Sequence, residues 1–324
     1  MSLLPPPLRR SSASAGPDQR SNAAPTLGSD AAQTQGPDAA QARGPDAAPT
    51  RSPDAAPTLG SDAAPTRSPD AAQTQGPDAA QAWRRQRGLL RSVRLFRLFR
   101  KEQTDPESFY GALAEDTVSQ IEDYCDLTGR RVVDVGGGPG HFTAAFAERG
   151  ARCYLFEPDS AEMLSRGAAP AGAVLADGYW LPVRDGGADL CLSSNVLEHV
   201  ADPLGLIEEM VRATRLGGLI YLSFTNWYSP HGGHEMSPWH YLGSRFAERR
   251  YVRRNGRLPK NRFGVTLFPV HVGAILRLMR SRRDIGIVDA LPRYYPRWCK
   301  PIVRIPGLRE IATWNLVLVL RRIE

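Results

Sequence analysis

From Arg131 to the end of the chain, short runs of Val, Ile and Leu alternate with stretches in which apolar residues recur every three to four positions. Continuous apolar runs of this length predict buried strands, and the three-to-four spacing predicts helices. Because the runs do not alternate with polar residues, both faces of the sheet are expected to be covered by helices, which predicts a doubly wound α/β fold. The expected strands are 132–135, 151–157, 173–176, 188–195 and 219–226. The expected helices are 141–148, 159–166 and 203–213. They are followed by a helix-like segment at 269–280 and by apolar segments at 285–291 and 315–323.

The first quarter of the chain follows a different pattern. From Arg20 to Trp83 an octapeptide of the type GPDAAPTR recurs eight times, and a period of eight fits neither a helix nor a strand. Its Ala, Pro, Asp, Gln and Thr residues bury too little apolar area to offset roughly 1–2 kcal/mol of backbone entropy per residue. We expect 1–83 to be a disordered, low-complexity tail. A tandem expansion, or a start assigned too far upstream, would explain it.

The folded part is expected to begin with two helices within 84–126. In the first, Leu90, Val93 and Phe96 recur at helical spacing among several arginines, which predicts an amphipathic helix with a strongly basic face. The second is expected from Pro106 to Tyr124, because proline favours the first turn of a helix.

Charge, cysteines and hydropathy narrow the partners and the compartment. The chain carries a net charge of +7, and because 1–83 holds six arginines and eight aspartates, the remainder carries +9, which favours an anionic partner. The four cysteines stand far apart and fit neither a zinc site nor a disulfide framework. No apolar run approaches the roughly 18 residues of a membrane span, and the N-terminus lacks an apolar signal core. A cytoplasmic location is expected, at a membrane surface or free of one.

A glycine-rich loop, "VVDVGGGPGH", joins the first expected strand to a helix. Glycine there indicates close approach of the backbone to a ligand, and the helix start offers free N–H groups. His141 stands where a dinucleotide fingerprint needs glycine, and no lysine completes a P-loop. What remains is D-x-G-x-G-x-G from Asp134 to Gly140, whose acidic first residue suits a cationic nucleoside such as S-adenosylmethionine. Alternatively, Asp134 holds the loop through backbone N–H groups.

Three residues at later strand ends fit the same ligand. Glu157 ends the second strand, where a carboxylate can accept hydrogen bonds from both ribose hydroxyls. Asp177 follows the third strand and is placed to accept from the adenine amino group. Asn195 ends the fourth strand and borders the same crevice.

At this point the sequence resembles the class I S-adenosylmethionine-dependent methyltransferases, in particular those of the type 11 kind. The resemblance rests on "VVDVGGGPG", "LFEPD", "ADGYWLPVRDGGADLCLSSNVLEHV" and "RATRLGGLIYLSF". It implies a seven-stranded Rossmann-like sheet for 84–324, which is similar to small uncharacterised actinobacterial methyltransferases. It also implies a cofactor site with the methionine and ribose along the glycine loop, the ribose on Glu157 and the adenine near the turn after the third strand. The loop residues are Gly136, Gly138 and Gly140, and the turn residues are Asp177, Gly178 and Tyr179.

The acceptor side is less defined by motifs. His199, in "LEHV", is the nearest titratable group, either as a base or acceptor-orienting residue or as a helix-start residue. An insert at 226–263 contains "HGGHEMSPWHY", in which His234 and Glu235, with Trp239, His240 and Tyr241, either contribute to an acceptor pocket or are structural. Two histidines four apart on one helix are absent, because proline interrupts the pattern, so no metal is expected.

A basic run ends this insert, with eight cations within residues 245–262. Its interleaved Phe, Leu and Tyr residues fit an anionic amphiphile or a lipid surface, and its charge also fits nucleic acid, although no recognisable RNA module accompanies it. The sequence therefore predicts methyl transfer to a small hydrophobic or lipid-like acceptor, using His199, His234 and Glu235. The alternatives are an RNA or protein methyltransferase and a non-catalytic module that binds the cofactor.

Overall fold

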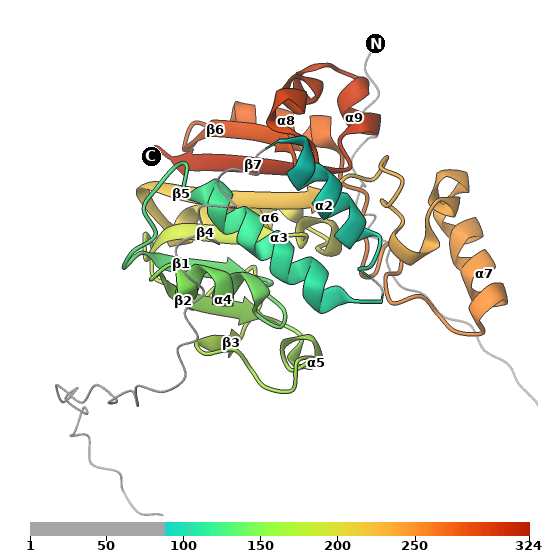
Figure 1. Ribbon diagram of the computed structural model, residues 1–324, viewed down its shortest axis with the longest axis horizontal. Helices are drawn as coiled ribbons and strands as arrows, with labels where there is room; N and C mark the ends of the chain where they lie inside the picture. The colour runs from blue at the N-terminus through green and yellow to red at the C-terminus, as the bar shows by residue number, and fades with distance from the viewer. Residues whose placement is uncertain (1–87, 103) are drawn as a thin grey trace, which may run out of the picture. The chain divides into compact units, whose positions relative to one another are not determined.

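The computed structural model describes residues 88–102 and 104–324 (Figure 1). The tail predicted for 1–83 lies outside the described residues. The strands are β1 (Arg131–Val135), β2 (Arg152–Glu157), β3 (Ala173–Leu175), β4 (Ala188–Ser194), β5 (Thr214–Thr225), β6 (Ile285–Pro292) and β7 (Asn315–Arg322). The α-helices are α2 (Leu89–Phe99), α3 (Pro106–Ile121), α4 (His141–Glu148), α5 (Ser160–Met163), α6 (Pro203–Ala213), α7 (Ser244–Asn255), α8 (Val272–Ser281) and α9 (Leu308–Ala312). Short 3₁₀ helices are η1 (Leu197–His199), η2 (His234–Met236), η3 (Trp239–Leu242) and η4 (Arg297–Arg304).

All strands belong to one seven-stranded sheet in the order β3-β2-β1-β4-β5-β7-β6. The strand pairs from β3 to β5 are parallel, and β7 is antiparallel to both of its neighbours. The predicted doubly wound, seven-stranded fold is confirmed. Because β7 runs against the others, its first residues lie at the same edge as the carboxyl ends of the other six strands. That edge is where ligands bind in sheets of this kind.

Helices cover both faces of the sheet, as the apolar runs predicted. On one face, α2, α3 and α4 pack on strand residues such as Val132 and Tyr221 (Figure 1). On the other, α6 and α8 pack on their sequence neighbours Val133 and Ile220. Successive strand side chains point to opposite faces, so a continuous apolar run supplies both cores.

Helix boundaries were predicted best where the sequence carries cap residues. The helix at 203–213 begins where expected, because the Asp202 side chain accepts from the N–H groups of Leu204 and Gly205 and proline occupies the first turn. Strand five was predicted too short: it begins at Thr214, which pairs with Ala188 across a register shift. The glycines of "RLGG" indicated a turn, so the start of the strand was placed after them.

The first helix, α2, is amphipathic but is not a free surface helix. Leu95 is fully buried, and the Phe96 ring contacts Tyr294, Tyr295 and Trp314 at centroid distances of 5.2–5.8 Å. Leu90 remains 73% exposed. The sequence pattern gave the helix correctly, but it could not show that the apolar face was already occupied by residues from the C-terminal region. No helix in the described part of the chain is both long and apolar enough to span a membrane.

Candidate active site

The glycine loop takes backbone angles that only glycine adopts easily. Gly136, Gly138 and Gly140 have φ values of 70°, 52° and 83°. A Cβ atom at Gly136 would lie 2.5 Å from Val196, and one at Gly140 would lie 2.5 Å from Pro170. The loop is therefore closed against its neighbours, and it leads directly into α4, whose first N–H groups point to the carboxyl edge.

Asp134 lies beneath this loop. Its side chain is 1% exposed and accepts a hydrogen bond from the Thr143 hydroxyl at 2.8 Å, which ties β1 to α4. Burial raises the pKa of Asp134 to about 7, and the nearby Glu157 charge acts in the same direction. The carboxyl group is thus ionised most readily when a positive charge comes close to the loop.

Glu157 and the turn after β3 flank the loop. The Glu157 carboxylate accepts from the backbone N–H of Gly138 at 2.9 Å and from that of Asp159 at 3.1 Å, and burial raises its pKa. Asp177 accepts from the backbone N–H of Tyr179 at 3.0 Å, and the Tyr179 hydroxyl accepts from the N–H of Asp202 at 2.9 Å. The predicted ribose and adenine residues are therefore held in place by loop hydrogen bonds.

Asn195 is held by residues that come after β6 and at the start of β7. It adopts a left-handed φ of 60°, and its side-chain oxygen accepts from Asn315 at 2.8 Å and from Arg293 at 3.4 Å. Arg293 is 1% exposed and also donates to the hydroxyls of Ser194, Ser223 and Thr117. Within the described residues it has no carboxylate partner. No sequence pattern indicated Arg293, since an arginine after a strand is ordinarily a surface residue.

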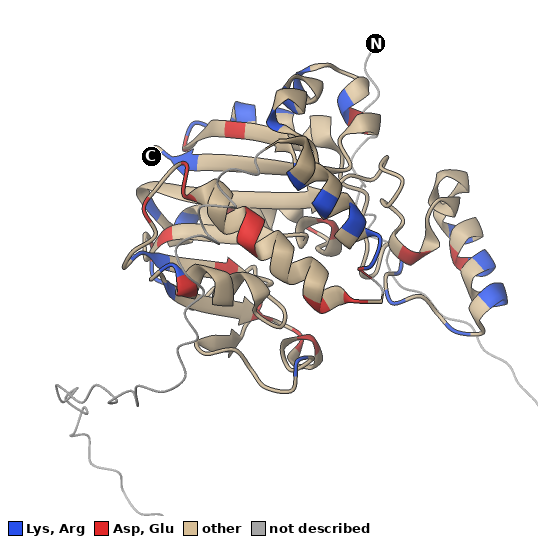
Figure 2. Cartoon of the chain, viewed as in Figure 1, with Lys and Arg blue, Asp and Glu red and all other residues tan. Residues whose placement is uncertain are grey.

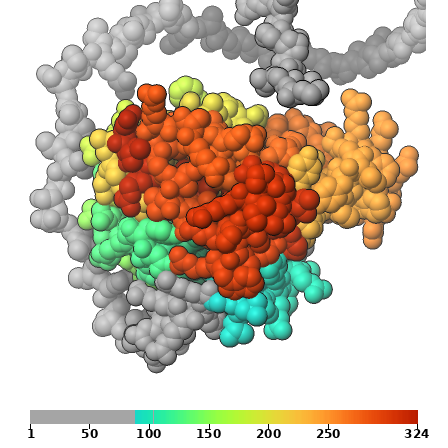
Figure 3. Space-filling model, turned by 90° about the horizontal axis from the view of Figure 1, so that it is seen from above, coloured from blue at the N-terminus to red at the C-terminus, as the bar shows by residue number. Residues whose placement is uncertain are grey.

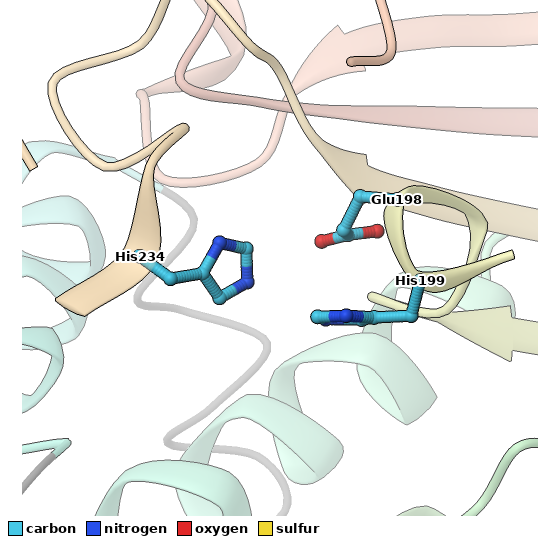
Figure 4. Close-up of side chains that lie close together, drawn as sticks. All are labelled: Glu198, His199 and His234. Carbon is cyan, nitrogen blue, oxygen red and sulfur yellow. The ribbon is translucent and has the colours of Figure 1, made fainter. Parts of the chain in front are cut away.

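Glu198, His199 and His234 converge at the carboxyl ends of β4 and β5 (Figure 4). The His199 and His234 rings lie edge to face with centroids 5.0 Å apart. His199 Nδ1 donates to the Thr266 carbonyl at 2.7 Å. One Glu198 oxygen accepts from the N–H of Thr225 at 2.9 Å, and the other is buried and has no hydrogen-bond partner. Burial and the neighbouring His199 lower the pKa of His234.

The structure brings His199 and His234 together but places Glu235 elsewhere. Both oxygens of Glu235 accept from Asn261, one from the backbone and one from the side chain, each at 2.8 Å. His240 is buried within the insert against the Trp227 carbonyl. Glu198 was overlooked in the sequence, although its position beside His199 in "LEHV" was a usable signal.

A row of aromatic rings joins the glycine loop to the insert. His141, the first residue of α4, stacks on Tyr110, which contacts Phe109. Phe109 contacts Phe99, and Phe99 contacts His231 at a centroid distance of 4.5 Å. The row continues through Tyr294 and Trp314, which contact Phe99 and His231 respectively. A continuous row of ring contacts thus runs from the glycine loop to the segment that carries His234.

Comparisons with known proteins identify the class of enzyme. A family model described as a methyltransferase domain matches residues 133–222. An "uncharacterized methyltransferase" of Mycolicibacterium gilvum is 51% identical over 245 residues, which cover 72% of this chain and 94% of the relative. One from Mycobacteroides abscessus is 50% identical, with the same shares covered. An S-adenosylmethionine-dependent methyltransferase of known structure from Mesorhizobium loti is 24% identical with a TM-score of 0.45, covering 64% of this chain and 98% of that one.

The chain belongs to the family of these mycobacterial methyltransferases. It is an S-adenosylmethionine-dependent methyltransferase, and S-adenosylmethionine is its cofactor. The prediction of a methyltransferase from the glycine loop and the later strand ends is confirmed. The alternative of a non-catalytic module that binds the cofactor no longer applies.

Proposed function

We propose that this enzyme methylates a small, largely apolar acceptor whose polar group lies against Glu198, His199 and His234. The observation that carries the proposal is the aromatic row from His141 to Trp314, because it runs from the glycine loop to His231, whose carbonyl accepts from the N–H of His234. Aromatic walls with a few convergent polar groups are typical of small-molecule sites.

For the cofactor, we assign the methionine and ribose to the glycine loop, the ribose hydroxyls to Glu157 and the adenine to the turn at 177–179. Asn195 borders the ribose. The hydrogen bond from the Gly138 N–H to the Glu157 carboxylate supports this assignment, because it fixes the position of Glu157 relative to the loop. A cationic ligand above Asp134 favours the ionised carboxylate and offsets part of its burial cost.

For the reaction, methyl transfer needs the acceptor atom in line with the sulfonium carbon, in a site that excludes water. The cluster provides imidazole nitrogens and a carboxylate to orient the acceptor and to receive its proton. Because the pKa of His234 is lowered, its ring is neutral at pH 7 and can interact with a hydroxyl or amine through its lone pair. Proton transfer of this kind typically contributes about 10²–10⁴-fold. We assign Glu235 to positioning the insert, because both of its oxygens accept hydrogen bonds from Asn261.

The proposed route for a lipid-like acceptor is the surface of α7. Basic residues gather along this helix (Figure 2), and in the view from above the insert stands beside the C-terminal elements, not beneath them (Figure 3). The arginines of α7 form no ion pair with any described residue, while Phe246 is 46% and Leu242 64% exposed beside them. They line a shallow hollow with Arg245, Arg249, Arg250, Arg253 and Arg254.

Exposed apolar side chains among unpaired cations fit an anionic lipid surface, where each cation contributes about 1 kcal/mol. We propose the surface of α7, and not α2, as the lipid-binding surface, because the Phe96 ring of α2 contacts other rings of the protein. Anionic vesicles should therefore sediment the enzyme and neutral ones should not. Phe246→Ser should weaken this at constant charge, and Val288→Ser, an equally exposed apolar site on β6, should not. Steeply salt-dependent binding to structured RNA without vesicle binding would instead favour a nucleic-acid acceptor.

The function itself is tested by labelling. The enzyme and methyl-labelled S-adenosylmethionine are incubated with fractionated extract, and the label is expected in the fraction extractable into organic solvent. His234→Ala should lower kcat with unchanged affinity for S-adenosylhomocysteine, whereas His271→Ala, at the start of α8, should change neither. Label in RNA or protein alone would overturn the proposal.

A further inference from the structure

We propose that Glu198, His199 and His234 form a binding site for one divalent transition-metal ion. One ligand atom from each residue lies within 4.8 Å of the others. The usual metal–ligand distances of about 2.0–2.2 Å are reached by small side-chain rotations from this spacing. The three side chains come from η1 and from the start of η2, and they point toward a common centre (Figure 4).

The ligands are already prepared for a metal. His199 Nδ1 must donate its proton to the Thr266 carbonyl, because a carbonyl only accepts. The other ring nitrogen, Nε2, therefore carries the lone pair that a metal needs, and the backbone carbonyl acts as the outer partner that commonly orients a metal-binding histidine. Glu198 is fixed in the same way by the Thr225 N–H, which leaves its second oxygen unpartnered.

The buried carboxylate of Glu198 favours a bound cation. Glu198 is 1% exposed and has no ion pair with any lysine or arginine among the described residues. A buried carboxylate is costly unless it is paired or coordinates a metal.

The donor set indicates which ions fit. Two imidazoles and one carboxylate suit zinc, cobalt, nickel, manganese and iron better than magnesium or calcium, which prefer oxygen ligands. Three protein ligands leave an open position. This inference rests on the proposed function for its consequence. With the ion bound, the two imidazoles and Glu198 would hold the metal instead of contacting the acceptor directly, and the open position would receive the oxygen of the acceptor and lower its pKa. Methyl transfer from the sulfonium needs no metal, so the ion would act on the acceptor alone.

The site is tested with cobalt, whose visible absorption reports its ligands. The tag-free full chain is dialysed against chelator and titrated with Co²⁺, and one equivalent is expected to bind. Residues 1–83 contain no histidine or cysteine, so the tail offers no competing imidazole or thiolate. Glu198→Gln and His234→Ala should each weaken Co²⁺ binding at least tenfold. His271→Ala is the matched control and should bind as the wild type does.

Calorimetry with S-adenosylhomocysteine shows which variants remain folded. Absence of stoichiometric Co²⁺ binding by the wild type would overturn the inference, and so would unchanged binding by a folded Glu198→Gln/His234→Ala double variant. The titration uses no acceptor, so its failure leaves methyl transfer to an apolar acceptor standing. Conversely, label transfer to RNA alone would remove the proposed function without affecting a measured Co²⁺ site.

Discussion

The two halves of the carboxyl edge are built in different ways. The cofactor half, around β1 and β2, is made from short contiguous segments: the glycine loop, Glu157 and the turn at 177–179, each held by hydrogen bonds to near neighbours. The acceptor half, around β4 to β7, is assembled from segments far apart in the chain. There Asn195 is held by Arg293 and Asn315, and His199 meets His234. Local motifs therefore build the proposed cofactor half, whereas tertiary packing builds the proposed acceptor half.

Replacing Arg293 with methionine should have the largest effect and should fall on the acceptor half. The change leaves buried hydroxyls on α3, β4 and β5 without their common donor. Leaving buried polar groups unpaired on this scale costs about 3–5 kcal/mol, which lowers Tm by roughly 10 °C or more in a domain of this size. Thermal unfolding measures it. Arg297→Met is the control: Arg297 pairs with Asp123 at 2.8 Å but is half exposed, and its loss should cost under about 1 kcal/mol.

This contrast also explains what the sequence could and could not predict. The strand pattern, the helix at 203–213 and the residues of the glycine loop follow from local composition and caps. Glu198 beside His199 was a signal for a polar site, but its convergence with His234 could not be predicted, because His234 comes from a separate segment and no local metal motif joins them. The ring contacts of Phe96 could not be predicted either, since Tyr294 and Trp314, which it contacts, come from the C-terminal region.

The next largest effect concerns the cofactor half and depends on pH. Folding raises the pKa of Asp134 from about 4 to about 7, so between these values the unfolded chain releases a proton that the folded chain keeps. Stability contributed by this group therefore falls as the pH rises through that window. Asp134→Asn should raise the free energy of unfolding by about 2–4 kcal/mol at pH 8 and change it little at pH 4. Chemical denaturation across pH measures this. Asp185→Asn, a change on the surface, is the control and should show the same dependence of the free energy of unfolding on pH as the wild type. A wild-type pH dependence in Asp134→Asn would contradict the prediction.

A smaller effect tests directly whether the two halves bind their ligands independently. Glu157→Gln keeps one acceptor for the loop but loses the charge toward the ribose, so S-adenosylhomocysteine should bind about 1.5–3 kcal/mol more weakly, or roughly 10–150-fold. Calorimetry measures this, with Glu148→Gln, an exposed carboxylate at the end of α4, as the control. Co²⁺ affinity at the acceptor half should not change. A parallel loss of both ligands would show that the halves are coupled, and the comparison would then fail.

The smallest expected effect lies where the two halves meet. Tyr110 stacks on His141 beside the glycine loop and donates to Glu102 at 2.7 Å. Burial raises the pKa of Glu102, and the Tyr110 hydrogen bond partly offsets that rise. Tyr110→Phe removes the offset, so the Glu102 pKa should rise further. Because a hydrogen bond to a charged group is stronger than one to a neutral group, the loss of stability should be about 1 kcal/mol larger at pH 8 than at pH 4. Denaturation at both pH values, with Tyr154→Phe on the exposed side of β2 as the control, distinguishes this from a general packing loss, which would be the same at either pH.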